Sequence, residues 1–171
     1  TTTLRMINYI LQPDEGNIWI NNQQAGPATQ SIIGYLPEER GLYKKMKVGE
    51  QLIYLAQLKG LSHQEAAQAI KYWLDRFNAS DWYDMEISEL SKGMTQKVQF
   101  IATIAHDPEI YIFDEPFSGL DPINSELLKD IIIELRDEGK TIIFSTHRME
   151  QIEQLCDDIC LINNGQAVLD G

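Results

Sequence analysis

The amino-acid sequence predicts an α/β fold, with a largely parallel sheet and a group of helices inserted between two parts of it. Two observations lead to this expectation. Residues 31–36, 110–113 and 141–146 form apolar runs of strand length, which are typical of strands covered on both faces. Segments with apolar residues at helical spacing separate these runs, and this alternation favours parallel strands joined by crossover helices.

The composition is that of one globular domain. The chain has 171 residues, 43% hydrophobic and 23% charged, which excludes a disordered or collagen-like chain. The net charge of −12 argues against non-specific nucleic-acid binding, because such binding requires clustered Lys and Arg. No apolar run approaches the roughly 18 residues of a membrane span. Cys156 and Cys160 are interpreted as plain buried thiols rather than a redox or metal pair.

The first third of the chain predicts short elements. Residues 1–11 place apolar side chains at helical spacing, and the turn-forming residues 13–16 end this helix. Residues 17–20 predict a short strand. The apolar run at residues 31–36 predicts a buried strand that Pro37 closes.

Residues 43–105 are expected to be mostly helical. Ser62 and Glu65 form a capping box, in which each side chain bonds the other residue's backbone N–H. A further helix is expected over residues 92–106, and His106 at its end is interpreted as a surface residue. This helical middle is interpreted as an insertion between two parts of the sheet.

The last third of the chain returns to alternating strands and helices. Asp121 is an N-cap residue followed by Pro122 at the first helical position, which predicts a helix running to about Glu138. A short helix is expected over residues 149–155. Two strands are expected over residues 159–162 and 166–169, joined by a tight Asn164–Gly165 turn.

The strongest candidate for chemistry is the acidic pair Asp114 and Glu115, which follows an apolar strand. In open α/β sheets, ligands bind at the carboxyl ends of the strands. Asp114 is suited to hold Mg²⁺, directly or through water, because Mg²⁺ prefers carboxylates together with phosphate oxygens. Glu115 is suited to orient or deprotonate an attacking water. The alternative is an exposed acidic turn without a catalytic role.

Further motifs surround this pair. Ser91 is expected to cap the helix that starts at residue 92, and with Gly93 it forms an anion-binding turn at a helix N-terminus. Residues 118–122 follow the acidic pair. His147 closes the next strand and is expected at the same sheet edge, although taken by itself it is more often an ordinary loop histidine.

In this order and spacing, the motifs resemble the nucleotide-binding domain of ATP-binding-cassette (ABC) ATPases. The resemblance covers essentially the whole chain. The family's signature motif corresponds to residues 90–94, and its Walker B aspartate with the catalytic glutamate corresponds to residues 114–115. Its D-loop corresponds to residues 118–121, its switch histidine to residues 146–147, and its Q-loop to residues 34–38.

The resemblance implies a RecA-like P-loop NTPase core with an inserted helical subdomain, lacking the N-terminal strands and the P-loop. Residues 1–171 would form a single, partial ABC ATPase domain. Residues 1–42 and 106–171 would form the core, and residues 43–105 the helical subdomain with the signature motif.

The resemblance also implies ATP and Mg²⁺ as cofactors and a head-to-tail dimer, of identical or different subunits, with two ATP molecules in its interface. Glu115 would position the attacking water, and His147 would contact the γ-phosphate. Ser91 and Gly93 would contact the γ-phosphate held by the partner chain. Asp121 would communicate across the interface.

Three positions depart from the usual family pattern. Lys92 replaces the second glycine of the signature, and Met94 replaces its glutamine. Glu38 stands where the Q-loop usually offers Gln to Mg²⁺ and water. A carboxylate can still coordinate the metal, so Glu38 is retained as a candidate ligand.

The sequence contains no G-x-x-x-x-G-K-[ST] motif, whose backbone N–H groups and lysine cradle phosphates. Residues 139–141 are a decoy, because position 134 is Glu and the triplet enters a strand. Thr1 resembles the Mg²⁺-binding residue that follows the Walker A lysine, and Thr2 the next phosphate contact. We interpret the chain as N-terminally truncated just after that lysine and expect weak or absent ATP hydrolysis by it alone.

The resemblance implies the ATPase subunit of an ABC transporter, which powers export through a transmembrane permease. Residues 34–43 look like subunits of bacterial ABC-2 exporters, including sodium-extrusion and drug-resistance systems. Such a subunit would be cytoplasmic and peripheral on the inner face of the cell membrane. Two alternatives remain: a soluble ABC ATPase acting on nucleic acid or ribosomes, which the acidic balance disfavours, and a non-catalytic fragment.

Overall fold

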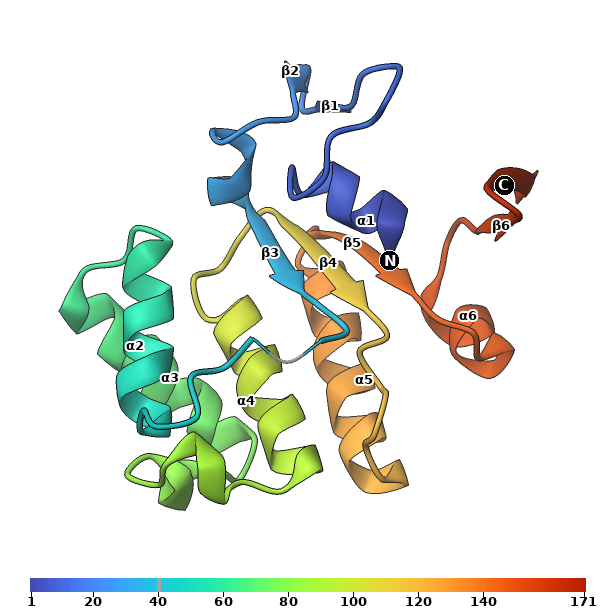
Figure 1. The fold of residues 1–171 in the computed structure, drawn as a ribbon. Coiled ribbons are helices and arrows are strands. Elements are labelled where there is room, and N and C mark those ends of the chain that lie inside the picture. Colours follow the sequence, from blue (N-terminus) through green and yellow to red (C-terminus); the bar gives the residue numbers. More distant parts are fainter. Residues whose placement is uncertain (40) are drawn as a thin grey trace.

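A three-stranded parallel sheet, in the order β3-β4-β5, lies at the centre of the computed structural model (Figure 1). The structure describes residues 1–39 and 41–171. Strand β3 spans Ile33–Leu36, β4 spans Ile110–Asp114 and β5 spans Thr141–Ser145. The predicted α/β class with parallel strands is therefore confirmed.

The register brings the three carboxyl strand ends to one edge. Ile110 at the start of β4 pairs with Ile33 of β3 on one side and with Thr141 of β5 on the other. At the far end of the same ladder, Asp114 pairs with Ser145. Residues that follow these strands therefore meet at this edge, which is where ligands bind in open α/β sheets.

Helices cover both faces of the sheet. They are α1 (Thr2–Ile7), α4 (Lys92–Ile104) and α5 (Pro122–Asp137). On one face, Leu4 of α1 clusters with Ile112 of β4. On the other face, Tyr111 and Phe113 of β4 join the main core with residues of α4 and α5. This alternation follows from the two-residue period of a strand.

Strand β3 approaches helix α4 very closely at Gly34. A Cβ atom there would lie 2.6 Å from the carbonyl oxygen of Thr103 and 2.9 Å from Cγ of Pro108. A larger residue would therefore push α4 away from the sheet. Glycine at this position sets the distance between the sheet and α4, the helix at whose start the predicted signature motif (residues 90–94) lies.

Helices α2 (Val48–Leu58) and α3 (His63–Arg76) occupy the middle of the chain. Two short 3₁₀ turns, Ser80–Trp82 and Ile87–Glu89, then lead to α4. The predicted capping box is confirmed. The Ser62 hydroxyl accepts the N–H of Glu65 at 3.3 Å, and the Ser62 N–H donates to the Glu65 carboxylate at 2.8 Å.

An ion pair joins α3 to α5. The two terminal nitrogens of Arg76 donate to the two carboxylate oxygens of Glu134, at 2.7 and 2.9 Å. The Arg76 guanidinium also lies 5.5 Å from the ring centre of Trp73 and 5.9 Å from that of Tyr72. This planar arrangement holds the end of α3 against α5.

The first helix is shorter than predicted. Helix α1 ends at Ile7, because the Asn8 side chain donates to the Leu4 carbonyl and Tyr9 has a positive φ of 56°. The predicted strand at residues 17–20 is reduced to β1 (Trp19–Ile20), which pairs antiparallel with β2 (Gln23–Gln24).

Two further boundaries differ from the prediction. The first two residues of the strand predicted at residues 31–36 belong to a 3₁₀ turn, Thr29–Ile32, so β3 begins at Ile33. Helix α4 ends at Ile104, and His106 is partly buried rather than a surface residue. Burial, together with the ammonium group of Lys59, lowers the pKa of His106 to about 4.

The C-terminal segment forms helix α6 (Met149–Leu155) and a β-hairpin, β6 (Cys160–Asn163) with β7 (Gln166–Asp170). The predicted Asn164–Gly165 turn is confirmed by its two positive φ angles, 48° and 76°. Figure 1 shows the hairpin standing away from the central sheet, and its strand residues are exposed. Both cysteines are free thiols, but the prediction that both are buried is wrong for Cys160, which lies on this exposed hairpin. Among the described residues, no helix combines the length and apolarity needed to cross a membrane.

Candidate functional site

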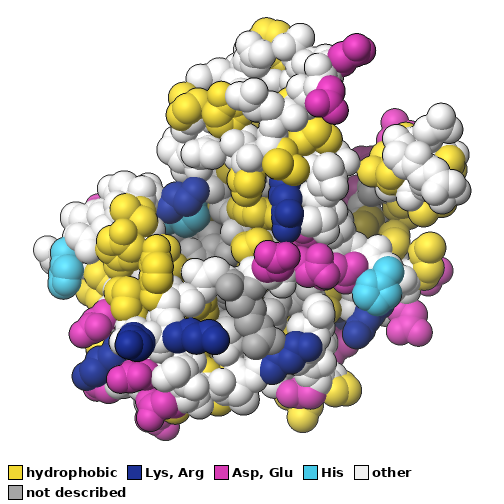
Figure 2. Space-filling view, in the orientation of Figure 1, with side chains coloured by type: hydrophobic (Ala, Val, Ile, Leu, Met, Phe, Trp, Pro, Cys, Tyr) yellow, Lys and Arg dark blue, Asp and Glu magenta, His cyan; other side chains and the backbone are white. Residues whose placement is uncertain are grey.

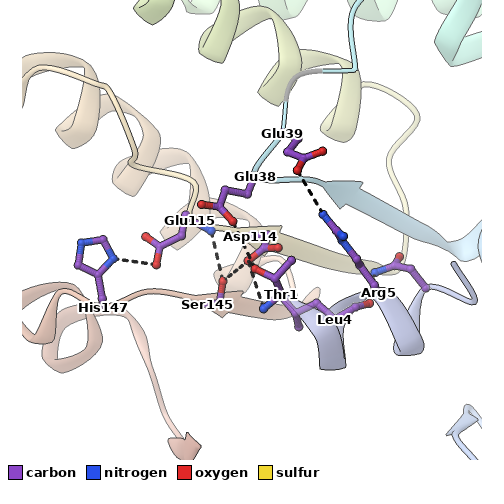
Figure 3. A network of polar contacts seen from close by, with 10 residues as sticks. Thr1, Leu4, Arg5, Glu38, Glu39, Asp114, Glu115, Ser145 and His147 are labelled. Carbon is purple, nitrogen blue, oxygen red and sulfur yellow. Dashed lines mark hydrogen bonds and ion pairs between the residues drawn. The ribbon is translucent and has the colours of Figure 1, made fainter. Parts of the chain in front are cut away.

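Three oxygen-bearing side chains converge at the carboxyl edge of the sheet (Figure 3). The hydroxyl of Thr1, just before α1, donates to Oδ1 of Asp114 at 3.2 Å. The same hydroxyl lies 3.4 Å from Oε2 of Glu38, in the loop after β3. The hydroxyl of Ser145, at the end of β5, also donates to Oδ1 of Asp114. Residues from three other parts of the chain thus lie around the Asp114 carboxylate.

The Asp114 carboxylate is suited to bind a cation. Its side chain is 1% exposed, and its Oδ2 atom is buried with no hydrogen-bond partner among the described residues. A buried anionic oxygen without a donor is costly, and a cation beside it removes that cost. Thr1 and Glu38 supply two more oxygens of the kind that Mg²⁺ prefers.

The protein alone supplies only part of a metal shell. No group of three or more His, Cys, Asp or Glu side chains is arranged to hold a metal in the part of the chain that the structure describes. Mg²⁺ commonly keeps several waters and takes phosphate oxygens as its remaining ligands. The arrangement of Thr1, Glu38 and Asp114 therefore fits a magnesium ion that arrives with a phosphate group.

Glu115 and His147 form a pair beside this cation site. The Nδ1 atom of His147 lies 2.9 Å from Oε1 of Glu115. The Glu115 backbone has a φ of 52°, in the left-handed region, which costs roughly 1–3 kcal/mol for a residue with a side chain. Its N–H donates to the carbonyl and hydroxyl oxygens of Ser145, at 3.2 and 3.3 Å, and these bonds hold the unusual backbone.

This sheet edge carries a strongly negative surface. Figure 2 shows acidic side chains gathered at the middle of the face, over the carboxyl ends of the strands, with a histidine beside them. Arg5 of α1 lies 3.9 Å from Glu39 and compensates only part of this charge. A phosphate group would be repelled here unless a cation accompanied it.

The predicted signature motif, residues 90–94, lies at the start of α4, beside the loop that follows Glu115. The Ser91 hydroxyl accepts the N–H of Met94 at 3.3 Å, which confirms the expected N-cap. A Cβ atom on Gly93 would lie 4.0 Å from the carbonyl oxygen of Gly119. Among the described residues, no hydrogen bond or ion pair joins Ser91 or Gly93 to the Asp114 group.

The other two predicted binding residues also lie apart from that group. Asp121 caps α5 by accepting the N–H of Asn124 at 2.9 Å, and this bond lowers the pKa of its carboxyl. Thr2 is exposed in the first turn of α1. The decoy Gly139–Thr141 connects α5 to β5 and opens no helix, as predicted.

Sequence reasoning did not select Ser145 or Gln96 as contributors to the site. Ser145 bonds both Asp114 and Glu115, and its signal was available, because pairing of two adjacent parallel strands places it opposite Asp114. Gln96 donates to the carbonyl oxygen of Pro116 at 3.2 Å across the space between α4 and the loop. No sequence pattern indicates that contact.

Comparisons of this chain with known proteins point to one family. A family model described as ABC transporter matches residues 1–118. The ABC transporter ATP-binding protein YhaQ of Bacillus subtilis is 50% identical over 171 residues, which are 100% of this chain and 57% of YhaQ. The ABC transporter ATP-binding protein NatA of Bacillus subtilis is 37% identical over 175 residues, 100% of this chain and 71% of NatA.

A solved structure of the ATP-binding subunit of an ABC transporter has a TM-score of 0.92 to this chain at 32% identity. The superposition covers 99% of this chain and 72% of that one. The chain thus spans a little over half of YhaQ and about seven tenths of NatA.

Proposed function

This chain belongs to the ABC transporter family, whose P-loop NTPase fold it shares, and we propose that it binds ATP with Mg²⁺ and hydrolyses the terminal phosphate. The observation that carries this proposal is the placement of two groups at one sheet edge. Asp114, Thr1 and Glu38 fit a cation, and Glu115 with His147 fits an attacking water. Phosphoryl transfer requires both parts side by side.

Asp114, Thr1 and Glu38 would hold the metal. When bound, Mg²⁺ neutralises charge on the phosphate oxygens. The Ser145 hydroxyl holds Oδ1 of Asp114, so that Oδ2 stays available for the ion or for a water bound to it. Thr2, one residue further along α1, would contact the phosphate.

Glu115 would orient a water for in-line attack and accept its proton. His147 would contact the γ-phosphate and hold the Glu115 carboxylate through the 2.9 Å contact. This histidine is far more exposed than Glu115, which leaves it free to reach a bound nucleotide. Positioning of water and phosphate, rather than covalent chemistry, supplies most of the catalysis in such reactions.

Ser91, Gly93 and Asp121 would act on a nucleotide held by a second chain. They lie beside the loop after Glu115 and make no bond to the Asp114 group among the described residues, which supports a composite site in a head-to-tail dimer. The partner would be an identical or a different ATP-binding subunit. In this proposal residues 43–105 form the helical subdomain that presents Ser91 and Gly93, and residues 1–42 and 106–171 form the core.

We further propose that hydrolysis powers export through a transmembrane permease, with the chain peripheral on the inner face of the cell membrane. The names of YhaQ and NatA as ABC transporter ATP-binding proteins support a role in transport. The resemblance of residues 34–43 to ABC-2 exporter subunits supports export. Co-purification with a permease would support this assignment, whereas co-purification with RNA or ribosomes would favour the soluble alternative.

ATP binding and hydrolysis by two chains tests the proposal. One is the 171-residue chain, which contains no phosphate-binding G-x-x-x-x-G-K-[ST] loop. The other carries that loop, joined before Thr1. We expect hydrolysis mainly in the extended chain, because the loop and its lysine supply most of the phosphate contacts.

A Glu115→Gln variant of the extended chain is the matched control. It should bind ATP and hydrolyse it far more slowly. If the extended chain binds no ATP, the proposal is wrong, and the chain would then be a non-catalytic module. If both chains hydrolyse ATP equally, the role given to the added phosphate-binding loop is wrong.

A further inference from the structure

The backbone around Glu115 is held from two sides. On the β5 side, the carbonyl oxygen of Ser145 accepts the Glu115 N–H at 3.2 Å. On the opposite side, the side-chain amide of Gln96 donates to the carbonyl oxygen of Pro116 at 3.2 Å. Gln96 lies on α4 and is 7% exposed, so this bond is shielded from water. The residue after Glu115 is therefore fixed to α4, the helix at whose start the predicted signature motif lies.

Lys92 makes a second contact between α4 and the same loop. A Cβ atom on Gly119 would lie 2.6 Å from Cε of Lys92 and 3.2 Å from its Cδ and Nζ atoms. The aliphatic stem of Lys92 thus lies directly against Gly119, whose φ is +78°. The first turns of α4 consequently hold the loop at two points, Pro116 and Gly119.

We propose that Gln96 is a positioning residue for Glu115, which it holds in place through the carbonyl of Pro116. Lys92, the residue that replaces the usual signature glycine, supports the same loop at Gly119. This inference rests on the proposed function, in which Ser91 serves the partner's nucleotide and Glu115 serves the chain's own. The Gln96 bond then links the two nucleotide sites through a single chain.

Backbone amide hydrogen exchange of the 171-residue chain tests the contact without requiring activity. Gln96→Met keeps the length of the side chain but removes the donor. We expect exchange in residues 115–119 to become about fivefold faster, the effect of losing one buried hydrogen bond. Gln51→Leu is the matched control: Gln51 is a buried glutamine of α2 whose amide has no partner among the described residues. It should leave this segment unchanged.

Lys92→Ala is a second test variant, to be used if the Gln96→Met chain does not fold. Because Lys92 is exposed, its replacement should not prevent folding. It should speed exchange around Gly119 by about twofold, since it removes packing rather than a buried bond. Unchanged exchange in residues 115–119 of a folded Gln96→Met chain, or of Lys92→Ala if the former does not fold, would overturn the proposal.

Kinetics of the chain extended by the phosphate-binding loop give a second readout. Gln96→Met should lower kcat about tenfold and leave KM for ATP unchanged, because a displaced Glu115 weakens only the transition state. A raised KM with unchanged kcat would contradict the positioning role. If the extended parent chain hydrolyses no ATP at all, the proposed function fails, while the exchange experiment still decides the role of Gln96.

Discussion

The Nδ1 atom of His147 lies 2.9 Å from Oε1 of Glu115, although the two residues follow different strands. The contact exists because β4 and β5 run parallel and in register, with Asp114 opposite Ser145. Each residue is the first or second one past its strand end. A pairing of this kind couples the group that would activate water to the group that would contact phosphate.

Replacing Glu115 by Gln should abolish most ATP hydrolysis in the chain extended by the phosphate-binding loop. We expect kcat to fall by about 10²–10⁴-fold, the usual contribution of a general base, while ATP binding persists. Steady-state phosphate release and fluorescent-nucleotide binding measure the two effects. Glu109→Gln is the control, because Glu109 is exposed at the opposite end of β4. Equal loss in both variants would contradict the assignment.

Asp114→Asn should remove the response of the protein to Mg²⁺. For the unsubstituted chain extended by the phosphate-binding loop, with ATP present, a Mg²⁺ concentration of one hundred times its Kd should add about 2.7 kcal/mol to the free energy of unfolding. The Asn variant should gain little, because an amide oxygen lacks the charge that attracts the ion. Denaturant unfolding with and without Mg²⁺ measures this difference, with the exposed Asp81→Asn as control. A Mg²⁺ response that survives in Asp114→Asn would exclude Asp114 as a ligand.

Breaking the ion pair between α3 and α5 should destabilise the chain modestly. Arg76→Ala should lower the free energy of unfolding by about 1 kcal/mol, because the Arg76–Glu134 pair is partly exposed and screened by solvent. The Arg76 guanidinium lowers the pKa of the Glu134 carboxyl. The contribution of the pair is therefore present above the ordinary carboxyl pKa and is lost as the pH falls through the lowered one. A double-mutant cycle with Glu134→Gln measures the coupling energy between the two side chains. Zero coupling at neutral pH would show that the ion pair does not stabilise the fold.

His106 should make the chain less stable at mildly acidic pH. Its folded pKa of about 4 lies below the ordinary histidine value, so the unfolded chain binds an additional proton between these two values. The free energy of unfolding should therefore fall by about 1–3 kcal/mol as the pH drops from about 6.5 to about 4. His106→Gln should flatten this slope in urea titrations at several pH values. His63→Gln, which alters an exposed histidine, is the matched control. An unchanged slope in His106→Gln would show that other groups cause the loss.

Local features could be predicted from the sequence because neighbouring residues create them. The Ser62–Glu65 capping box, the Asp121 N-cap and the Asn164–Gly165 turn each depend on a few adjacent residues, and all three form as expected. The early end of the first helix was missed, because it depends on a left-handed Tyr9 that apolar spacing does not indicate.

Much of the candidate site was also predictable in kind. An acidic pair after a buried strand and a histidine after the next one indicated a shared sheet edge, and the structure places Asp114, Glu115 and His147 there. The burial of His106 was not predictable, since it depends on how β3, α2 and α4 pack together. Its position at a helix end favoured a surface location.

The sequence by itself determined the α/β class, the family and the residue types available for chemistry, because strand-length apolar runs and ordered motifs are local and additive signals. Only the tertiary structure decided which of these residues share a site. Thr1 and Asp114 stand far apart in the chain and yet bond at 3.2 Å. Helix packing is a long-range property that residue spacing does not encode, and it places the Gln96 side chain against the carbonyl of Pro116.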